Sequence, residues 1–267
     1  VPVNVRRPLG LSAGLVGKLL SEIHLACPEQ GAPEQLALQL RQAVDEFIPS
    51  HLNLRANHSF LDALGRERLA DCRLCAHDCG VNRLAGETGL CHAGADARFF
   101  SAQVEVSDEM ELIPTFAVAL SGCDLRCSFC IPGQESWNAH AGLGFDAATM
   151  AARGTAALDN GARTIMVLGG EPTIHLPAAL EFVSLLPDSV KLIWKTNAHG
   201  TSPAGELRDG MFDVWLADFK FGNDVCAQRL AKVSNYVRIV QENLLWANEH
   251  SELIVRHLLM PGHVECC

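Results

Sequence analysis

The chain has 267 residues, of which 48% are hydrophobic and 19% are charged, and its formal net charge is −10. Length and composition predict a globular protein with one large domain and a smaller one, and the negative charge argues against nucleic acid as a partner, because nucleic-acid-binding surfaces are basic. Without an apolar run of about 18 residues or an N-terminal secretion signal, we expect a cytoplasmic protein with no membrane contact, in which eleven cysteines indicate metal binding rather than disulfides.

Two amphipathic helices are predicted in the N-terminal region, residues 1–70. Apolar residues recur there at nearly helical spacing in two series: Leu11, Leu15, Leu19 and Ile23, and, after Pro33, Leu36, Leu40, Val44 and Phe47. Such stripes pack against a protein core far more often than they bind cofactors. We therefore assign no chemistry to this helical region.

The next segment, residues 71–111, contains four cysteines in the spacing C-x2-C-x3-C-x11-C, namely Cys72, Cys75, Cys79 and Cys91. Four soft ligands this close together, with glycines between them, are typical of a metal site. A tetrahedral zinc ion and a second iron–sulfur cluster both fit this donor set. Redox-active thiols are a third interpretation. His77 and His92 are additional ligands, although an exposed loop histidine is the simpler interpretation of each.

Strands and helices alternate from residue 112 onward. Strands are predicted at 115–120, 164–168, 190–194, 213–217 and 253–259, and helices at 146–159, 177–186, 203–209 and 235–249. This alternation indicates an α/β fold with a parallel sheet and right-handed crossovers. In barrels of this kind the chemistry gathers at the carboxyl ends of the strands. We therefore look for functional residues directly after each strand.

The first predicted strand is followed by Cys123, Cys127 and Cys130, in the spacing C-x3-C-x2-C. Three thiolates on one tight loop can hold three irons of a cubic iron–sulfur cluster, which leaves the fourth iron without a cysteine from this loop. The spacing does not match the common zinc motifs. We therefore predict a [4Fe–4S] cluster with one open iron.

Polar residues and glycines follow the other strands as well. In chain order they are Gly169-Gly170-Glu171, Thr196-Asn197, Asp218 with Lys220, and Arg256 within the last strand. Paired glycines let a ligand approach the backbone closely, and a neighbouring carboxylate can accept hydrogen bonds from an ammonium group. A charged arginine inside a strand needs a partner, for which a carboxylate is the best fit.

The cysteine loop resembles the C-x3-C-x-aromatic-C hallmark of the radical S-adenosylmethionine (SAM) enzymes, with Phe129 in the aromatic position. The motifs that follow the predicted strands, taken in chain order, resemble those of the pyruvate formate-lyase activating enzyme branch of these enzymes. The four-cysteine segment, with Cys-Gly-Val-Asn-Arg at 79–83 and Gly-Glu-Thr-Gly-Leu-Cys at 86–91, resembles a less characterised subgroup of activating-enzyme homologues.

The resemblance implies a (β/α)6 TIM-like radical SAM barrel over residues 112–267. The sequence predicts five of its six strands. We therefore expect a partial barrel, truncated after strand five, behind the helical region and the cysteine-rich segment.

The resemblance also implies cofactors and roles. A [4Fe–4S] cluster on Cys123, Cys127 and Cys130 reduces SAM, which yields a 5′-deoxyadenosyl radical that takes hydrogen from a substrate. Glu171 with the backbone of Gly169 and Gly170 would bind the SAM amino group, and Arg256 its carboxylate. The residues expected to line the SAM and substrate side are Thr196, Asn197, Asp218 and Lys220. A flavodoxin or ferredoxin is implied as electron donor.

Three functions remain open from the sequence. The branch that the chain resembles activates glycyl-radical proteins, so such a protein is the first candidate substrate. A radical SAM enzyme that modifies a peptide or a small metabolite is the main alternative, because a fold does not determine its substrate. An iron–sulfur electron-transfer module is the more distant one, because electron transfer alone requires neither the Gly-Gly-Glu turn nor an arginine in a strand.

Overall fold

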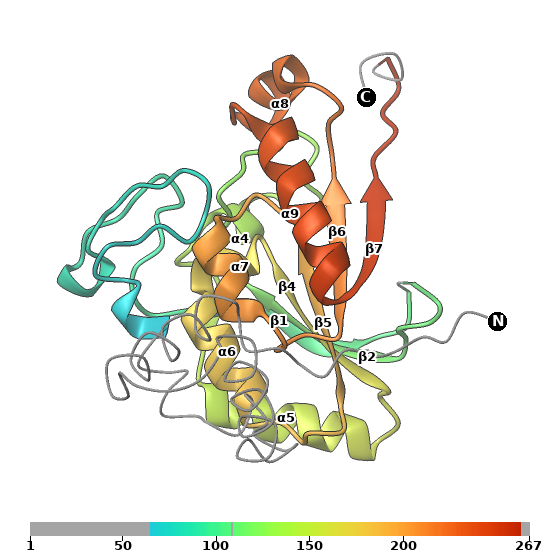
Figure 1. The fold of residues 1–267 in the computed structure, drawn as a ribbon. Coiled ribbons are helices and arrows are strands. Elements are labelled where there is room, and N and C mark those ends of the chain that lie inside the picture. The colour runs from blue at the N-terminus through green and yellow to red at the C-terminus, as the bar shows by residue number, and fades with distance from the viewer. Residues whose placement is uncertain (1–64, 108, 263–267) are drawn as a thin grey trace, which may run out of the picture. The chain divides into compact units, whose positions relative to one another are not determined.

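The computed structural model describes residues 65–107 and 109–262, which belong to one compact unit, Leu54–Cys267 (Figure 1). The two helices predicted within residues 11–47 lie outside the described residues. No helix in the described part is both long and apolar enough to cross a membrane.

The elements follow one another in an α/β order. After the short 3-10 turn η2 (Arg83–Ala85) come β1 (Arg98–Glu105), β2 (Thr115–Leu120), α4 (Gln134–Trp137), β3 (Leu143–Gly144), α5 (Ala147–Asp159), β4 (Thr164–Gly169), η3 (Pro172–His175), α6 (Leu176–Ser184), β5 (Lys191–Thr196), α7 (Ser202–Arg208), β6 (Val214–Phe219), α8 (Asp224–Ala231), α9 (Tyr236–His250) and β7 (Glu252–His257). The five predicted strands and the four predicted helices from residue 112 onward are therefore confirmed to within a few residues.

Local sequence signals explain where the helices begin and end. The Asp146 side chain caps α5 by accepting a hydrogen bond from the backbone of Thr149 at 2.7 Å. The same helix ends at Asn160, and Gly161 then takes a positive φ of 101° that favours glycine. Thr201 caps α7 in the same way as Asp146 caps α5.

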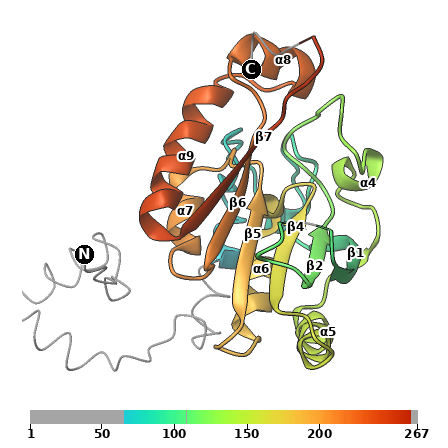
Figure 2. The same cartoon turned by 90° about the vertical axis from the view of Figure 1, so that its right-hand side faces the viewer.

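The seven strands form one sheet in the order β3-β1-β2-β4-β5-β6-β7. Strands β2, β4, β5, β6 and β7 run parallel, whereas β1 pairs antiparallel with both β2 and β3. The sheet is open, because β3 and β7 lie at its opposite ends. Figure 2 shows the parallel strands β2, β4, β5, β6 and β7 side by side. The α/β class is confirmed, and closure into part of a TIM-like barrel is not.

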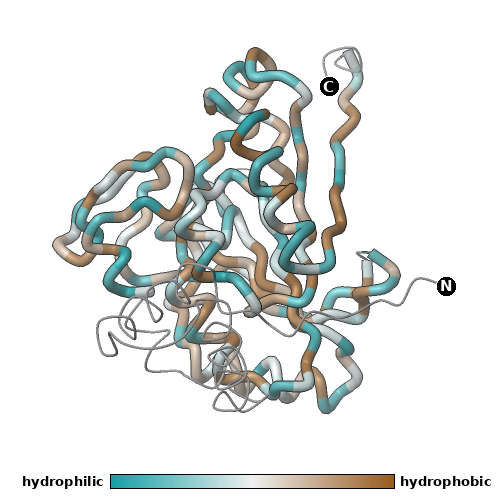
Figure 3. The backbone as a smooth tube through the Cα atoms, viewed as in Figure 1, coloured by the Kyte–Doolittle hydropathy of each residue, from teal (hydrophilic) through white to brown (hydrophobic). Residues whose placement is uncertain are grey.

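The central strands are buried on both faces, which explains their continuous apolar runs (Figure 3). Alternate residues such as Val118, Val167 and Trp194 pack in one cluster with α5 and α6. Their neighbours Ala117 and Met166 lie in a separate cluster on the opposite face. Because the five parallel strands share one direction, their carboxyl ends meet at one edge of the sheet, where the predicted site residues follow.

Candidate functional site

The loop after β2 carries the three cysteines predicted from the sequence as cluster ligands. Cys123 and Cys127 are buried, and Cys130 is half-buried. The backbone N–H of Leu125 donates to Cys123 Sγ at 3.4 Å, and the Ser136 hydroxyl lies 3.2 Å from Cys130 Sγ. Hydrogen bonds to cysteine sulfurs are part of how proteins tune iron–sulfur clusters. The donor set and its surroundings therefore fit a [4Fe–4S] cluster.

The environment of the loop disfavours cysteine thiolates that are not bound to a metal ion. Burial, with the neighbouring Asp124 carboxylate, raises the pKa of Cys123 well above its usual value. Burial also raises the pKa of Cys127, to about 11, although the Lys220 ammonium opposes the shift. Both thiols hold their protons at neutral pH in the absence of metal, so metal binding must release them.

The paired glycines after β4 bring that strand end directly against the cysteine loop. A side chain at Gly169 would collide with the Leu120 carbonyl, and one at Gly170 would collide with the carbonyls of Gly122 and Ser136. The Gly170 N–H donates to Leu120 O at 3.0 Å. Glycine is required here by the close approach of two backbones.

Glu171 is 1% exposed and holds two strand ends together. Its carboxylate accepts hydrogen bonds from the N–H and hydroxyl of Thr173 at 3.0 and 2.5 Å, from the Thr196 hydroxyl at 2.8 Å and from the Asn197 N–H at 2.8 Å. Burial and the Asp124 charge raise the pKa of Glu171, and these donors oppose the shift. Contact between Glu171 and SAM stays a prediction, because its oxygens already serve four donors within the chain.

A buried arginine supports the same network from α7. The Arg208 guanidinium lies over the rings of Trp215 and Trp194, at 4.4 and 5.2 Å from their centroids, and donates to the Thr173 hydroxyl at 2.9 Å. Burial lowers the pKa of Arg208 to about 10, while the nearby Glu171 charge raises it. The sequence did not indicate this residue.

Asp218, Lys220 and Arg256 form one charged group at the ends of β6 and β7. Lys220 Nζ lies 2.6 Å from Asp218 Oδ2, and Arg256 Nε lies 2.8 Å from Asp218 Oδ1. Arg256 Nη1 also reaches Glu109 Oε1 at 3.5 Å. Burial alone would raise the pKa of Asp218, but the two cations outweigh it and lower the pKa. The Arg256 side chain is 39% exposed, so a ligand can still reach its guanidinium.

Asp124 and His199 belong to the site although the sequence did not single them out. His199 Nδ1 lies 2.7 Å from Asp124 Oδ2, the Asn197 amide donates to Asp124 Oδ1 at 2.8 Å, and His77 Nε2 donates to Asp124 O at 2.8 Å. Potential ligand atoms of His77, Asp124 and His199 all lie within 4.8 Å of one another, so this group could also hold a metal ion. Their positions, next to Cys123 and at the end of β5, are the signal that could have found them.

The four-cysteine segment packs against the same sheet edge. Cys72 forms an isolated β-bridge with Val81, and Cys75 forms one with Gly200 in the loop after β5. Cys75 and Cys91 share one buried cluster. A side chain at Gly89 would collide with the sulfur of Cys79, so glycine is needed there. The fold thus brings residues 72–91 into one compact loop around its cysteines.

Arg83 is a buried cation beside this group, and its exposed fraction is 2%. Its guanidinium donates to Ile174 O at 2.6 Å, to Gly94 O at 2.9 Å and to Cys72 Sγ at 3.6 Å, and approaches His175 Nδ1 at 3.4 Å. None of these partners within the described residues is a carboxylate. A buried charge needs an opposite charge, which thiolates of a metal centre would supply.

The burial of His175 should make the free energy of unfolding depend measurably on pH. Burial, with the neighbouring Arg83 charge, lowers the pKa of His175 to about 3. Between pH 7 and pH 5 the unfolded chain gains a proton on this residue, whose unfolded pKa is about 6.5, whereas the folded chain does not. The free energy of unfolding should therefore fall by about 2 kcal/mol more in the parent than in His175→Asn over this range.

Urea denaturation at the two pH values measures this difference. His140→Asn, which replaces an exposed histidine, is the control and should follow the parent. Equal pH slopes for the parent and His175→Asn would contradict the buried, neutral state of His175.

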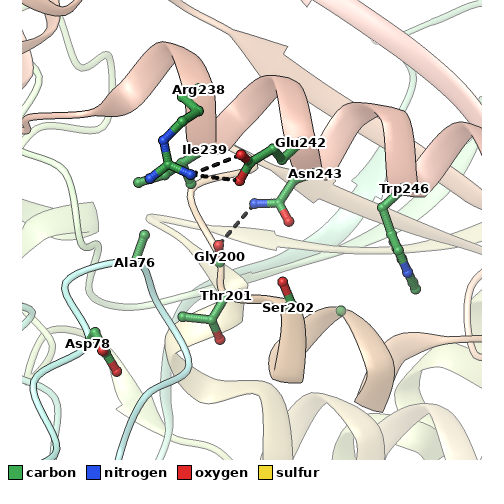
Figure 4. Close-up of a pocket in the computed structure, with 11 residues that line it drawn as sticks. Ala76, Asp78, Gly200, Thr201, Ser202, Arg238, Ile239, Glu242, Asn243 and Trp246 are labelled. Atoms are coloured by element: carbon green, nitrogen blue, oxygen red, sulfur yellow. Dashed lines mark hydrogen bonds and ion pairs between the residues drawn. The ribbon is translucent and has the colours of Figure 1, made fainter. Parts of the chain in front are cut away.

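A cavity of about 500 Å³ lies between the cysteine-rich segment, the loop before α7 and the face of α9 (Figure 4). The Arg238–Glu242 pair of α9 lines it opposite Asp78, and the Asn243 amide donates to Gly200 O at 2.9 Å. Among the described residues, none that lines this cavity is a predicted cluster ligand or SAM-binding residue.

Comparisons with known proteins support an iron–sulfur cluster at the cysteine loop. The chain is 32% identical over 208 residues to an uncharacterized protein of Methanocaldococcus jannaschii, an alignment that covers 74% of this chain. The chain spans 59% of the length of that relative. Residues 115–202 match the family described as a 4Fe-4S single cluster domain. Cys123, Cys127 and Cys130 lie inside the matched residues, and the chain therefore contains a 4Fe–4S cluster domain.

Proposed function

We propose that the chain is a radical SAM enzyme whose cluster is held by Cys123, Cys127 and Cys130. The observation that carries the proposal is the meeting of three features at one sheet edge: a three-cysteine loop, a glycine pair packed on it, and a partly exposed group of opposite charges. When bound, the reduced cluster supplies the single electron that cleaves SAM to methionine and a 5′-deoxyadenosyl radical. An electron-transfer protein would need only the first feature.

The charged group would bind the carboxylate of SAM. Arg256 has five N–H donors, so it can bind a carboxylate while it keeps its bond to Asp218. Lys220 adds a second positive charge near Cys127. Asp218 fixes the positions of both cations and so acts as a positioning residue.

The glycine pair would serve the amino group of SAM through its backbone. Gly169 and Gly170 pack their backbone directly against the cysteine loop and are themselves half-buried, so the main chain of this turn lies next to the proposed cluster. Glu171 fixes this turn against β5 through its bonds from Thr196 and Asn197, and its Oε2, which accepts from the Asn197 N–H, would accept a further bond from the amino group. The apolar contact of Phe129 with Phe221, at 5.8 Å between centroids, helps to keep water from the loop.

The substrate that fits the resemblance is a glycyl-radical-type protein, activated by hydrogen abstraction, with a flavodoxin or ferredoxin as electron donor. Modification of a peptide or a small metabolite is the alternative, because the same strand ends can serve several substrates.

The proposed function is tested by incubating the anaerobically reconstituted, dithionite-reduced protein with SAM. We expect release of 5′-deoxyadenosine, measured by chromatography and mass spectrometry. Arg256→Lys should lower this rate, because lysine cannot form two parallel bonds to a carboxylate. Arg163→Lys, at an exposed arginine outside the site, is the matched control. A protein with a full cluster that leaves SAM intact would instead be an electron-transfer module.

A further inference from the structure

The two cysteine groups of this chain touch through hydrogen bonds. His77, which lies between Cys75 and Cys79, donates from Nε2 to the carbonyl of Asp124, the residue after Cys123, at 2.8 Å. A second hydrogen bond also joins the two groups. Arg126, the residue before Cys127, donates from Nη2 to the carbonyl of Leu90, the residue before Cys91, at 3.2 Å.

The space between the groups is largely closed to water. Cys75, Cys91, Cys123 and Asp124 are all less than a tenth exposed. The Asp124 carboxylate contributes to the raised pKa values of Cys75 and Cys123 alike, so one buried charge lies close to both groups. Asp124 is in turn held by Asn197 and His199 from the loop after β5. The inner members of the two cysteine groups therefore lie in one buried, hydrogen-bonded region.

The four sulfurs are suitable donors for zinc and for an iron–sulfur cluster alike. The position of the segment favours a cluster, because two hydrogen bonds, from His77 to Asp124 and from Arg126 to Leu90, join it to the loop of the first cluster. A zinc ion has no redox chemistry, whereas an iron–sulfur cluster at this position could exchange an electron with its neighbour.

The two cysteine groups are each partly open to solvent, on different segments. Cys130 is half-buried and Ile131 beside it is fully exposed, so SAM and the substrate would reach the first loop from this side. In the four-cysteine segment Cys79 is half-buried, and Leu84 and Leu90 are exposed apolar residues next to the group. A protein donor can therefore approach there without blocking the first loop.

We propose that Cys72, Cys75, Cys79 and Cys91 hold a second iron–sulfur cluster, which passes single electrons across the His77–Asp124 contact region to the cluster at Cys123, Cys127 and Cys130. The redox change is balanced: the outer cluster loses one electron as the inner one gains it. A low-potential one-electron donor of the flavodoxin or ferredoxin class then reduces the outer cluster again. The electron's use in SAM cleavage rests on the proposed function. Arg83 supplies the positive charge that balances the outer thiolates.

The test compares the full-length protein with the double variant Cys75→Ser/Cys79→Ala after anaerobic reconstitution, because two cysteines are too few to hold a cluster whereas three are enough. Iron, acid-labile sulfide and zinc are measured, and the dithionite-reduced samples are studied by electron paramagnetic resonance. The parent should bind about twice the iron of the double variant, with no stoichiometric zinc. Its signal should be broadened by spin–spin interaction between two neighbouring clusters, and the double variant should give a narrow signal of one cluster. Cys226→Ala, which removes a cysteine of α8, should match the parent, and Cys72→Ser/Cys79→Ala provides a second double variant should the first fail to fold.

The outcomes separate this proposal from the proposed function. One zinc per chain, or equal iron in parent and variant, would overturn the second cluster while SAM cleavage by the parent still stands. Two clusters without magnetic interaction would overturn the electron transfer. Two interacting clusters in a protein that leaves SAM intact would support the pair and contradict the radical SAM function.

Discussion

We expect Cys127→Ala to lose the cluster of the first loop and to reduce SAM cleavage to the level found without protein. Cys127 is buried in the middle of the loop, and the next cysteine along the chain, Cys130, is already a proposed ligand. A three-cysteine site that loses one thiolate retains two ligands for a cluster of four irons, which is too few to hold it. Iron analysis and the visible absorbance after anaerobic reconstitution measure the loss.

The matched control for this variant is Cys226→Ala. Cys226 is equally buried and lies in the same apolar cluster as Cys123 and Cys127, but on α8. Its replacement creates a similar small cavity without removing a proposed ligand, so iron content should stay at the parent level. Full iron at the first loop in Cys127→Ala would refute the assignment of this ligand.

The second large effect is expected on stability, from Glu171→Gln. The substitution keeps the shape of the side chain but replaces one acceptor oxygen by an NH₂ group, which then faces buried donors such as the Asn197 N–H. It also removes the charge that strengthens the bonds from Thr173 and Thr196. We expect the free energy of unfolding to fall by about 3 kcal/mol.

Chemical denaturation of the metal-free protein measures this loss without interference from cluster binding. Glu249→Gln, at an exposed position of α9, is the control and should change stability by less than about 0.5 kcal/mol. A loss of that small size in Glu171→Gln would mean that the bonds from Thr196 and Asn197 do not hold the ends of β4 and β5 together.

The parallel part of the fold could be predicted because each strand carries its own signal. The run at 115–120 is wholly buried, and β4 and β7 each contain a short apolar run with β-branched residues, so the apolar pattern is local. Strand β1 was missed, because Arg98–Glu105 has no clear alternation and becomes a strand by pairing with β2. Helix α8 was also missed, since eight residues capped by Asn223 depend on packing against α9 and the cysteine loop.

The candidate site shows the same division. Cysteine spacing and the Gly-Gly-Glu turn are sequence patterns, and the residues they indicate do converge at one sheet edge. Asp124, His199 and Arg208 are single polar residues without a pattern, and Arg83 stands in the 79–83 motif without any sign there of its partners. Their roles depend on burial and on partners far away in the sequence, such as Ile174 for Arg83 and Thr173 for Arg208.

The position of Arg208 between two indole rings gives this protein a built-in optical reporter. Trp194 and Trp215 are almost wholly buried, and a neighbouring guanidinium influences the emission of both rings. The same guanidinium is bonded to Thr173, which is bonded to Glu171. A rearrangement of the turn after β4 on ligand binding would therefore move the cation relative to the rings. Intrinsic fluorescence would then report ligand binding at the turn after β4 in real time, without any label.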